Sequence, residues 1–369
     1  MRVLVLWADD LSPNLGVRVL AEGNAALVRR VWPDAQFTFQ NSGRPLSELP
    51  VGRFRSLLRE RVTGEKGMMR WLRSFDLVID TRSGDSFADI YGWRRHGMMS
   101  AVLHTAAAAG VPVVLGPQTI GPFTTLLGRR LGVRSLRQAS LVMARDSASA
   151  EYARSLGEHV DVVTTDVVFA LPVPEIERTR DVVLNISGLL WRENPHVDSA
   201  SYRAIVTELY AALRADDRRV TLLAHVLDSS SADNDVPAVR EFSETIAPDA
   251  EVVVPADLDD VRRVVASAQL VIGSRMHACL NALSVGTPAI ALAYSRKFAP
   301  LLADLGWAHT VGLDRPDSAV AGVLAAAASP TLLHDAADVR ERAQTLLVPA
   351  VVALESLGAV TTARDGGGA

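Results

Sequence analysis

The chain has 369 residues, of which 49% are hydrophobic and 22% are charged, and its formal net charge is −4. This length predicts two domains rather than one, and the apolar content suffices for two packed cores. The sequence contains no run of basic residues, which argues against a general nucleic-acid-binding protein.

Short β-type runs alternate with helical patterns along the first half of the chain. The first run follows directly on the N-terminal methionine and predicts a strand, not a signal peptide. The predicted strands are residues 3–7, 77–79, 111–115 and 141–144, and the clearest helical patterns are residues 16–31 and 98–109.

The second half repeats this scheme. Its predicted strands are residues 182–186, 220–224, 251–254, 270–272 and 289–293, and its helices are residues 202–215, 236–246, 258–266 and 276–285. Strands that alternate with helices indicate parallel sheets covered on both faces. We therefore expect an α/β protein of two doubly wound, Rossmann-like domains that face a cleft, the preferred place for a ligand.

A segment with two prolines followed by charges, residues 170–180, predicts the hinge between the domains. The N-terminal domain is then residues 1–172 and the C-terminal domain residues 180–345. Residues 346–360 predict a last helix that could pack back on the first domain, and the small, polar residues 361–369 predict a disordered tail. No apolar run reaches the roughly 18 residues of a membrane span, so we expect a cytoplasmic protein.

The most informative segment joins the strand 270–272 to a helical pattern through Gly-Ser-Arg275-Met-His277. Open α/β sheets bind ligands at the carboxyl ends of their strands, where helix N-termini point free N–H groups at anions. An arginine and a histidine there indicate an anionic substrate that also needs a proton. The alternative is a surface arginine followed by an ordinary histidine at a helix start. Cys279, the one cysteine, lies on the apolar side of this helix and predicts a buried thiol.

Two strand ends of the first half also carry polar groups. The loop 115–123 contains two Gly-Pro pairs, which fix its backbone, and it can present Gln118 to a ligand. Arg145 follows the strand 141–144 and could hold a carboxylate or phosphate as a planar fork, while Asp146 or Ser147 caps the next helix. The alternatives are a tight structural turn and a surface Arg–Asp pair.

Further candidates follow other strands. Asp85 and Asp89 are four residues apart and could accept hydrogen bonds from sugar hydroxyls or act as a base, or they could serve as caps and turn residues. His225 is either a ligand-facing residue or a structural histidine. Lys297 adds a cation to the face that holds Arg275, unless it is a solvated residue at a helix start.

Arg145, Arg275, Lys297 and His277 each come just after a predicted strand, so they are expected to face the same cleft. The sequence has no Walker loop and no Gly-x-Gly-x-x-Gly after a strand, so neither P-loop nor dinucleotide binding is indicated. The eight histidines show no His-x-x-x-His pair and no carboxylate at ligand spacing, so no metal site is predicted.

In these segments the chain resembles the polysaccharide pyruvyl transferase family. The matching segments, in the family's order, are Asp76-Leu-Val-Ile79, Gly84-Asp-Ser-Phe-Ala-Asp89, Pro117-Gln-Thr-Ile-Gly-Pro-Phe123, Ala144-Arg-Asp-Ser-Ala-Ser149, Thr165-Asp166, Leu223-Ala-His225-Val226, Ile272-Gly-Ser-Arg-Met-His277, Gly286-Thr-Pro288 and Tyr294-Ser-Arg-Lys297. The resemblance implies a two-domain fold like that of GT-B glycosyltransferases. It also implies transfer of pyruvate from phosphoenolpyruvate to a sugar of an envelope polysaccharide or glycolipid, as a ketal, with release of phosphate.

The resemblance further implies phosphoenolpyruvate as co-substrate without another cofactor, and a sugar or lipid-linked saccharide as acceptor. His277 would be the general acid, because an unperturbed imidazole titrates near neutrality. The implied donor-binding residues are Arg145, Arg275, Lys297 and Gln118. The candidates for the acceptor side are Asp85, Asp89 and His225.

Two segments depart from the family pattern. The family often has Gly-Asn-x-Gly-Asp near the N-terminus, whereas this chain has Pro13-Asn-Leu-Gly16-Val17 and lacks the aspartate. The family often has a run of glycines after the strand 77–79, whereas Arg82 here is expected to add a cation near the cleft. Two other functions stay open, namely a GT-B glycosyltransferase that uses a nucleotide sugar and a non-catalytic relative in glycan assembly.

Overall fold

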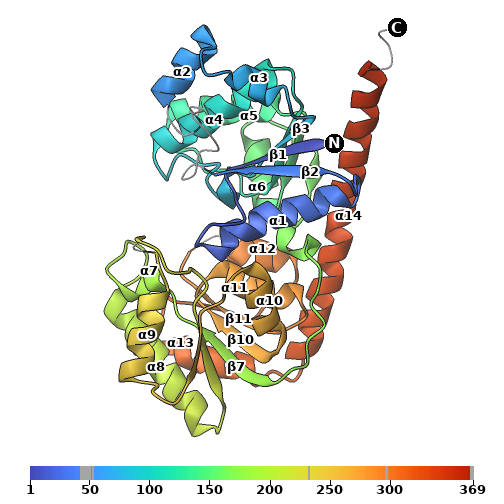
Figure 1. Cartoon of the computed structure of the whole chain (residues 1–369). Helices are drawn as coiled ribbons and strands as arrows, with labels where there is room; N and C mark the ends of the chain where they lie inside the picture. The colour runs from blue at the N-terminus through green and yellow to red at the C-terminus, as the bar shows by residue number, and fades with distance from the viewer. Residues whose placement is uncertain (42–50, 52–53, 232, 296–297, 366–369) are drawn as a thin grey trace. The chain divides into compact units, whose positions relative to one another are not determined.

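The computed structural model describes residues 1–41, 51, 54–231, 233–295 and 298–365. Its contacts divide the chain into two compact units. The first unit comprises Met1–Asp10, Leu20–Leu171 and Ala343–Ala369, and the second comprises Leu11–Val19 and Pro172–Arg342. Each unit contains one six-stranded sheet with helices packed on it (Figure 1).

The sheet of the first unit has the strand order β2-β1-β3-β4-β5-β6, and all its strand pairs are parallel. Its strands are β1 Arg2–Leu6, β2 Gln36–Gln40, β3 Leu77–Asp80, β4 Val113–Gln118, β5 Leu141–Ala144 and β6 Val162–Val163. Strands β3, β4 and β5 bury every residue, as parallel strands do when helices cover both faces. The chain reverses its direction of travel across the sheet between β1 and β3.

The helices of this unit pack on the sheet or, like α2 and α3, on the neighbouring helix α4. They are α1 Leu15–Arg29, α2 Phe54–Thr63, α3 Met68–Leu72, α4 Trp93–Ala108, α5 Leu126–Gln138 and α6 Ser147–Ser155, with 3₁₀ turns at Arg82–Gly84 and Val167–Ala170. Helix α4 buries Met99, Val102 and Leu103 in the core of the unit. The carboxylate of Asp146 accepts a 2.7 Å hydrogen bond from Ser149 N, which confirms the predicted cap of α6.

The second sheet has the order β12-β11-β10-β7-β8-β9 and is also parallel throughout. Its strands are β7 Arg180–Asn185, β8 Val220–Leu223, β9 Glu251–Val253, β10 Ala268–Gly273, β11 Ala289–Ala293 and β12 Thr310–Gly312. Numbered from β7, this is the 3-2-1-4-5-6 order of a Rossmann sheet. The topological switch point, where ligands of such sheets bind, therefore lies between the ends of β7 and β10.

The helices of the second unit lie on both sides of this sheet. They are α7 Gly188–Trp191, α8 Ser199–Ala215, α9 Val236–Thr245, α10 Leu258–Ala266, α11 Met276–Ser284, α12 Phe298–Asp304, α13 Pro316–Ala327 and α14 Leu332–Asp365. Figure 1 shows α10 and α11 on one side of the sheet and α8 and α13 on the other. This arrangement confirms the predicted fold class of two doubly wound, Rossmann-like units.

The last helix, α14, belongs to both units, since its residues from Ala343 onward group with the first. Within that unit Thr164 Oγ1 donates to the carbonyl of Leu346 at 2.7 Å, and Gln344 Nε2 donates to that of Phe169 at 2.7 Å. The helix continues to Asp365, into the segment whose composition predicts disorder. Of the described helices, none alone has the length and apolarity to cross a membrane, although the bent pair α13 and α14 meets that test together.

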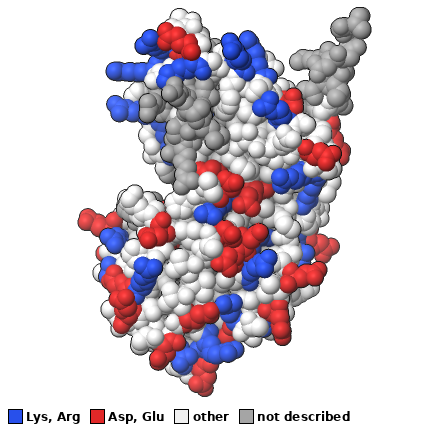
Figure 2. Space-filling model, in the orientation of Figure 1, with Lys and Arg blue, Asp and Glu red and all other residues white. Residues whose placement is uncertain are grey.

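Lysine and arginine predominate around the upper end of the face shown in Figure 2, whereas its lower part carries residues of both signs side by side.

Candidate functional site

The Arg-x-His motif lies between β10 and α11, the strand-to-helix junction that the sequence predicts, and the strand order places this junction at the switch point of the second unit. Arg275 is the N-cap residue of α11, directly after β10, and His277 stands in the first turn of the helix. The backbone N–H of Arg275 donates to Asn185 Oδ1 at 3.0 Å, and Asn185 Nδ2 donates to the carbonyl of Leu223 at 3.0 Å. One asparagine thus fixes the ends of β7, β8 and β10 relative to one another.

A buried carboxylate, Asp235, is the hub of this site. Its Oδ1 accepts from Gly188 N at 2.7 Å and from Nε and Nη2 of Arg275 at 3.1 and 2.7 Å. Its Oδ2 accepts from the backbone N–H groups of His225 and Val226 at 3.0 and 2.9 Å. Sequence analysis missed this residue. An aspartate just before Val-Pro indicates a helix cap, yet Asp235 makes no side-chain cap bond to α9.

The guanidinium of Arg275 is held by two carboxylates. Besides its bonds to Asp235, Nη1 donates to the carboxylate of Asp233 and Nη2 to its backbone carbonyl, both at 2.5 Å. Burial lowers the pKa of Arg275, but the charges of Asp235 and Asp233 outweigh this and raise it above its usual value. The residue is a permanently charged anchor, and the cation predicted to bind a substrate anion already binds protein carboxylates.

His225 lies in the same network and is neutral. Arg262 Nη1 donates to Asn281 Oδ1 at 3.0 Å, so the amide turns its Nδ2 towards His225 Nε2 at 3.2 Å. That ring nitrogen must therefore accept, which leaves the proton on Nδ1. Burial lowers the pKa of His225 well below its usual value, and the charges of His277 and Arg275 act in the same direction. This geometry favours the structural alternative for His225 over contact with an acceptor.

The segment Leu11–Val19 near the N-terminus belongs to the second unit and lies against His277. Asn14 pairs with Val226 in an antiparallel bridge, and Leu15 N donates to the carbonyl of His225 at 3.3 Å. A Cβ at Gly16 would lie 2.7 Å from His277 Nδ1. The glycine retained from the family's N-terminal motif thus permits close contact between this loop and the imidazole.

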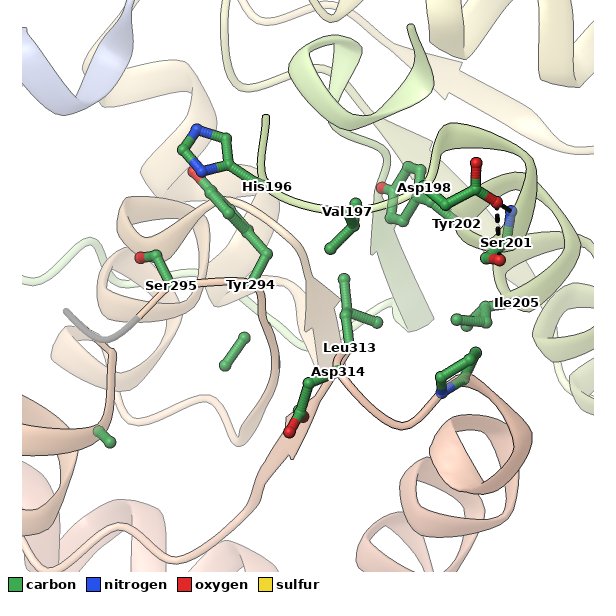
Figure 3. Close-up of a pocket in the computed structure, with 14 residues that line it drawn as sticks. His196, Val197, Asp198, Ser201, Tyr202, Ile205, Tyr294, Ser295, Leu313 and Asp314 are labelled. Carbon is green, nitrogen blue, oxygen red and sulfur yellow. Dashed lines mark hydrogen bonds between the residues drawn. The ribbon is translucent and has the colours of Figure 1, made fainter. Parts of the chain in front are cut away.

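A pocket of about 660 Å³ adjoins the switch point in the same unit (Figure 3). Tyr202 of α8 lines it and links it to the motif, because its hydroxyl lies 2.8 Å from Ser274 Oγ and accepts from Ser187 N at 2.9 Å. Burial raises the pKa of Tyr202 to about 12, so the phenol stays protonated and can donate to Ser274. Tyr294, which directly follows β11, lies on the opposite wall.

In the first unit, the predicted donor residues Gln118 and Arg145 lie at the ends of adjacent strands and are almost fully buried. Arg145 Nε donates to Thr119 Oγ1 at 3.0 Å and Nη1 to Asp166 Oδ2 at 3.2 Å. Arg145 Nη2 and both polar side-chain atoms of Gln118 have no hydrogen-bond partner among the described residues. Buried polar atoms are rarely left so, which marks this cluster as a place for a polar ligand or water.

The loop that follows Gln118 is a packed structural element. Gly121 has a φ of 75°, and a Cβ there would lie 2.1 Å from the ring of Tyr152. The hydroxyl of Tyr152 accepts from Phe123 N at 2.6 Å. The second Gly-Pro pair therefore packs the loop against α6. This favours the alternative of a tight structural turn for this part of the loop.

The two predicted acceptor carboxylates differ in their surroundings. Asp89 accepts four hydrogen bonds of 2.7–2.9 Å from the N–H and hydroxyl groups of Thr124 and Thr125. Burial opposes ionisation, but these four bonds outweigh it and lower the pKa of Asp89 to about 2. Asp85 is half-buried and accepts from the hydroxyl of Tyr91 at 3.1 Å. Asp89 thus orders the loop before α5, the capping alternative, while Asp85 stays a prediction.

Three predicted residues remain, namely Lys297, Cys279 and Arg82. Lys297 lies outside the described residues. Cys279 is buried, as predicted, and burial raises the pKa of its thiol to about 12. Arg82 was expected near a cleft but is fully buried inside the first unit, where Nε pairs with Asp80 at 3.0 Å and the guanidinium covers the Phe87 ring. Within the described part of the chain, no cluster of three or more His, Cys, Asp or Glu side chains could hold a metal ion.

Two doubly wound sheets, with polar residues gathered at the switch point of the second, define a GT-B-like α/β protein. The model of the family described as polysaccharide pyruvyl transferase matches residues 14–296, and the chain belongs to this family. No curated protein matches the chain.

Solved structures similar to this one share its fold at low sequence identity. A putative UDP-N-acetylglucosamine 2-epimerase from Listeria monocytogenes is 12% identical, with a TM-score of 0.60 over 99% of this chain and 97% of that one. The UDP-GlcNAc 2-epimerase from Neisseria meningitidis, bound to UDP-GlcNAc, is 12% identical, with a TM-score of 0.57 over 99% and 100%. Anabaena HepE, in complex with UDP-glucose, gives the same values. At this identity the likeness concerns the fold alone.

Proposed function

We propose that this protein transfers pyruvate from phosphoenolpyruvate to two hydroxyls of a saccharide, with the Arg-x-His motif of the second unit as the donor site. The observation that carries the proposal is the place of Arg275 and His277 at the switch point, in a chain that belongs to the pyruvyl transferase family. A fixed guanidinium and an imidazole at a helix start meet the two needs of this donor, namely a cation for its anionic groups and a proton for its methylene carbon.

In the proposed reaction, His277 donates a proton to the methylene carbon, and positive charge develops at the carbon that carries the phosphate. The first acceptor hydroxyl forms a bond to that carbon and returns a proton to His277. The second hydroxyl forms the other C–O bond as the C–O bond to phosphate breaks, and its proton leaves with the phosphate. Burial of the site strengthens the electrostatic interactions that stabilise this charge shift.

The two carboxylates that bind Arg275 differ in their exposure to solvent. Asp235 is fully buried, whereas the side chain of Asp233 is 31% exposed. We infer that Nε and Nη2 keep their bonds to Asp235, while Nη1 exchanges Asp233 for an anionic oxygen of the donor. In the first unit, Arg145 and Gln118 remain candidates for an anionic group, and their buried atoms without a described partner support this assignment.

Phosphate release from phosphoenolpyruvate in the presence of saccharide acceptors tests the proposal through His277→Ala. The variant should lower kcat at least 100-fold, in line with the contribution of general acid catalysis of about 10²–10⁴. Its affinity for phosphoenolpyruvate should stay within a few-fold of the wild type. The matched control is His159→Ala, since the side chain of His159 is 84% exposed. Loss of donor binding without loss of turnover of the bound donor would exclude His277 as the acid.

A further inference from the structure

The pocket beside the switch point is lined by residues other than those of the Arg-x-His motif. Its walls come from the start of α8 and the loop before it, from the ends of β11 and β12, and from α12 and α13 (Figure 3). A volume of about 660 Å³ falls in the range of small-molecule sites. Phosphoenolpyruvate, with three carbons and one phosphate, would fill only a small part of it.

The described lining residues carry negative rather than positive charge. None of the fourteen described lining residues is lysine or arginine, and two of them, Asp198 and Asp314, carry carboxylates. The side chain of Asp198 is held in place by hydrogen bonds of 2.8 Å from the N–H and hydroxyl of Ser201. An ionised carboxylate can accept hydrogen bonds but cannot donate them, so it favours a ligand that presents hydroxyl donors. Its negative charge also repels phosphates.

Aromatic and aliphatic side chains supply the rest of the surface. The rings of His196 and Tyr294 pack with their centroids 5.2 Å apart, and Tyr294 packs edge-on against Phe298 at 5.7 Å. Val197 and Leu313 lie between the two carboxylates in Figure 3. A pyranose ring has apolar C–H faces and polar edges. A half-buried tyrosine beside apolar side chains fits the faces, and carboxylates at the rim can accept hydrogen bonds from the hydroxyls at the edges.

The pocket is also connected to the reacting groups. Tyr202 forms part of its wall, and its hydroxyl lies 2.8 Å from Oγ of Ser274, the residue before Arg275. We propose that this pocket binds a neutral monosaccharide unit of the acceptor, with Tyr294 as its stacking platform and Asp198 and Asp314 as acceptors for its hydroxyls. This assignment deepens the proposed function and rests on it, because the hydroxyls to be modified must lie beside the donor.

The test is ligand-observed NMR with the full-length protein and a panel of methyl glycosides of glucose, galactose, mannose, N-acetylglucosamine and N-acetylmannosamine. At least one glycoside should bind to the wild type. Tyr294→Ala should weaken that binding at least tenfold, whereas Tyr294→Phe, which keeps the ring, should retain it. Asp314→Asn, at an exposed carboxylate, should weaken it several-fold. Ser318→Ala, outside this pocket, is the matched control.

Three results would overturn the assignment: no glycoside of the panel binds, glycoside binding is unchanged in Tyr294→Ala, or uridine diphosphate displaces the bound glycoside. Titration of the same variants with phosphoenolpyruvate separates this idea from the proposed function. Glycoside binding that depends on Tyr294 in a protein that does not bind phosphoenolpyruvate would reject the donor and keep the saccharide site. Donor binding without glycoside binding would do the reverse.

Discussion

The motif residues Arg275 and His277 could be located from sequence because a strand end and a helix start leave a local pattern. Their partners could not. Asp235 is 40 residues from Arg275 in the chain, and Asn185 is 90 residues away. Only the assembled sheet brings the ends of β7, β8 and β10 together. The same limit explains why the sequence predicted Arg275 as a cation for a substrate anion and did not predict the two carboxylates that hold it.

A first prediction concerns the competition between Asp233 and the donor. The two carboxylates and one guanidinium of Asp233, Asp235 and Arg275 have a net charge of −1. If Asp233 must release Nη1, then Asp233→Asn should bind phosphoenolpyruvate about fivefold more tightly, since a partly exposed ion pair contributes about 1 kcal/mol. Calorimetric titration of both proteins measures this change.

The control for this variant is Asp228→Asn, in the same loop but with Asn234 as its hydrogen-bond partner. It should leave donor affinity unchanged. Weaker binding by Asp233→Asn would contradict the exchange and would instead assign Asp233 a part in holding Arg275 in its productive position.

A second prediction concerns Gly16, which lies against the ring of the proposed acid His277. Gly16→Ala places a methyl group 2.7 Å from His277 Nδ1, so the ring must move. We expect kcat to fall at least tenfold and the NMR signals of the His277 ring to shift. Gly322→Ala in α13 is the matched control, because its nearest neighbours are 3.4 Å away and fit a methyl group. Normal kcat in Gly16→Ala would show that the position of the ring is not critical.

At the scale of elements, the carboxylates of the first unit show how one residue type serves different needs. Asp80 neutralises the buried Arg82, whose Nη1 and Nη2 donate to Ser100 of α4 and Ser135 of α5. Arg82 therefore joins β3 to two helices. The sequence could not distinguish this cation from a ligand-binding one, because both follow a strand directly.

A third prediction follows from Asp89, whose four hydrogen bonds order the start of α5. Its folded-state pKa of about 2 lies below the usual value of an aspartate, roughly 3.9. The stability it contributes, about 2 kcal/mol, is therefore complete above the usual pKa and is lost as pH falls through the folded value. Asp89→Asn should be destabilised by about this amount at pH 7.

Denaturant unfolding of wild type and Asp89→Asn between neutral pH and roughly pH 2.5 measures this contribution. The stability difference should be constant down to about pH 5 and then shrink with acidification. Asp34→Asn, at an exposed carboxylate of the same unit, should behave like the wild type throughout. A difference that grows on acidification would contradict the assignment.

Elements with buried, strongly patterned strands were predicted from sequence, and weakly patterned ones were not. Strands β1, β3, β4, β5, β7, β8, β10 and β11 overlap their predicted ranges because apolar residues dominate them. The short edge strand β9 also overlaps its predicted range, since two of its three residues are valine. The edge strand β2 has the sequence Gln-Phe-Thr-Phe-Gln with partly buried residues, and β6 and β12 have two and three residues. These three strands carry too little apolar pattern to be recognised.

At the scale of the whole molecule, the fold and the function have different kinds of support. Nucleotide-sugar enzymes share this fold at about 12% identity, and a shared fold does not transfer an activity. Membership of the pyruvyl transferase family, together with the motif at the switch point, is what directs the proposal to phosphoenolpyruvate. The identity of the donor substrate, rather than the fold, is therefore what an experiment must test.

The most direct test is calorimetric titration of the full-length protein with phosphoenolpyruvate and, separately, with uridine diphosphate, on wild type and Arg275→Lys. The lysine keeps the charge beside Asp235 but lacks the planar fork, and thermal unfolding checks that the variant is folded. We predict saturable binding of phosphoenolpyruvate to the wild type that is at least tenfold weaker in the variant, and no binding of the nucleotide. Binding of uridine diphosphate without phosphoenolpyruvate, or donor affinity unchanged in Arg275→Lys, would contradict the account.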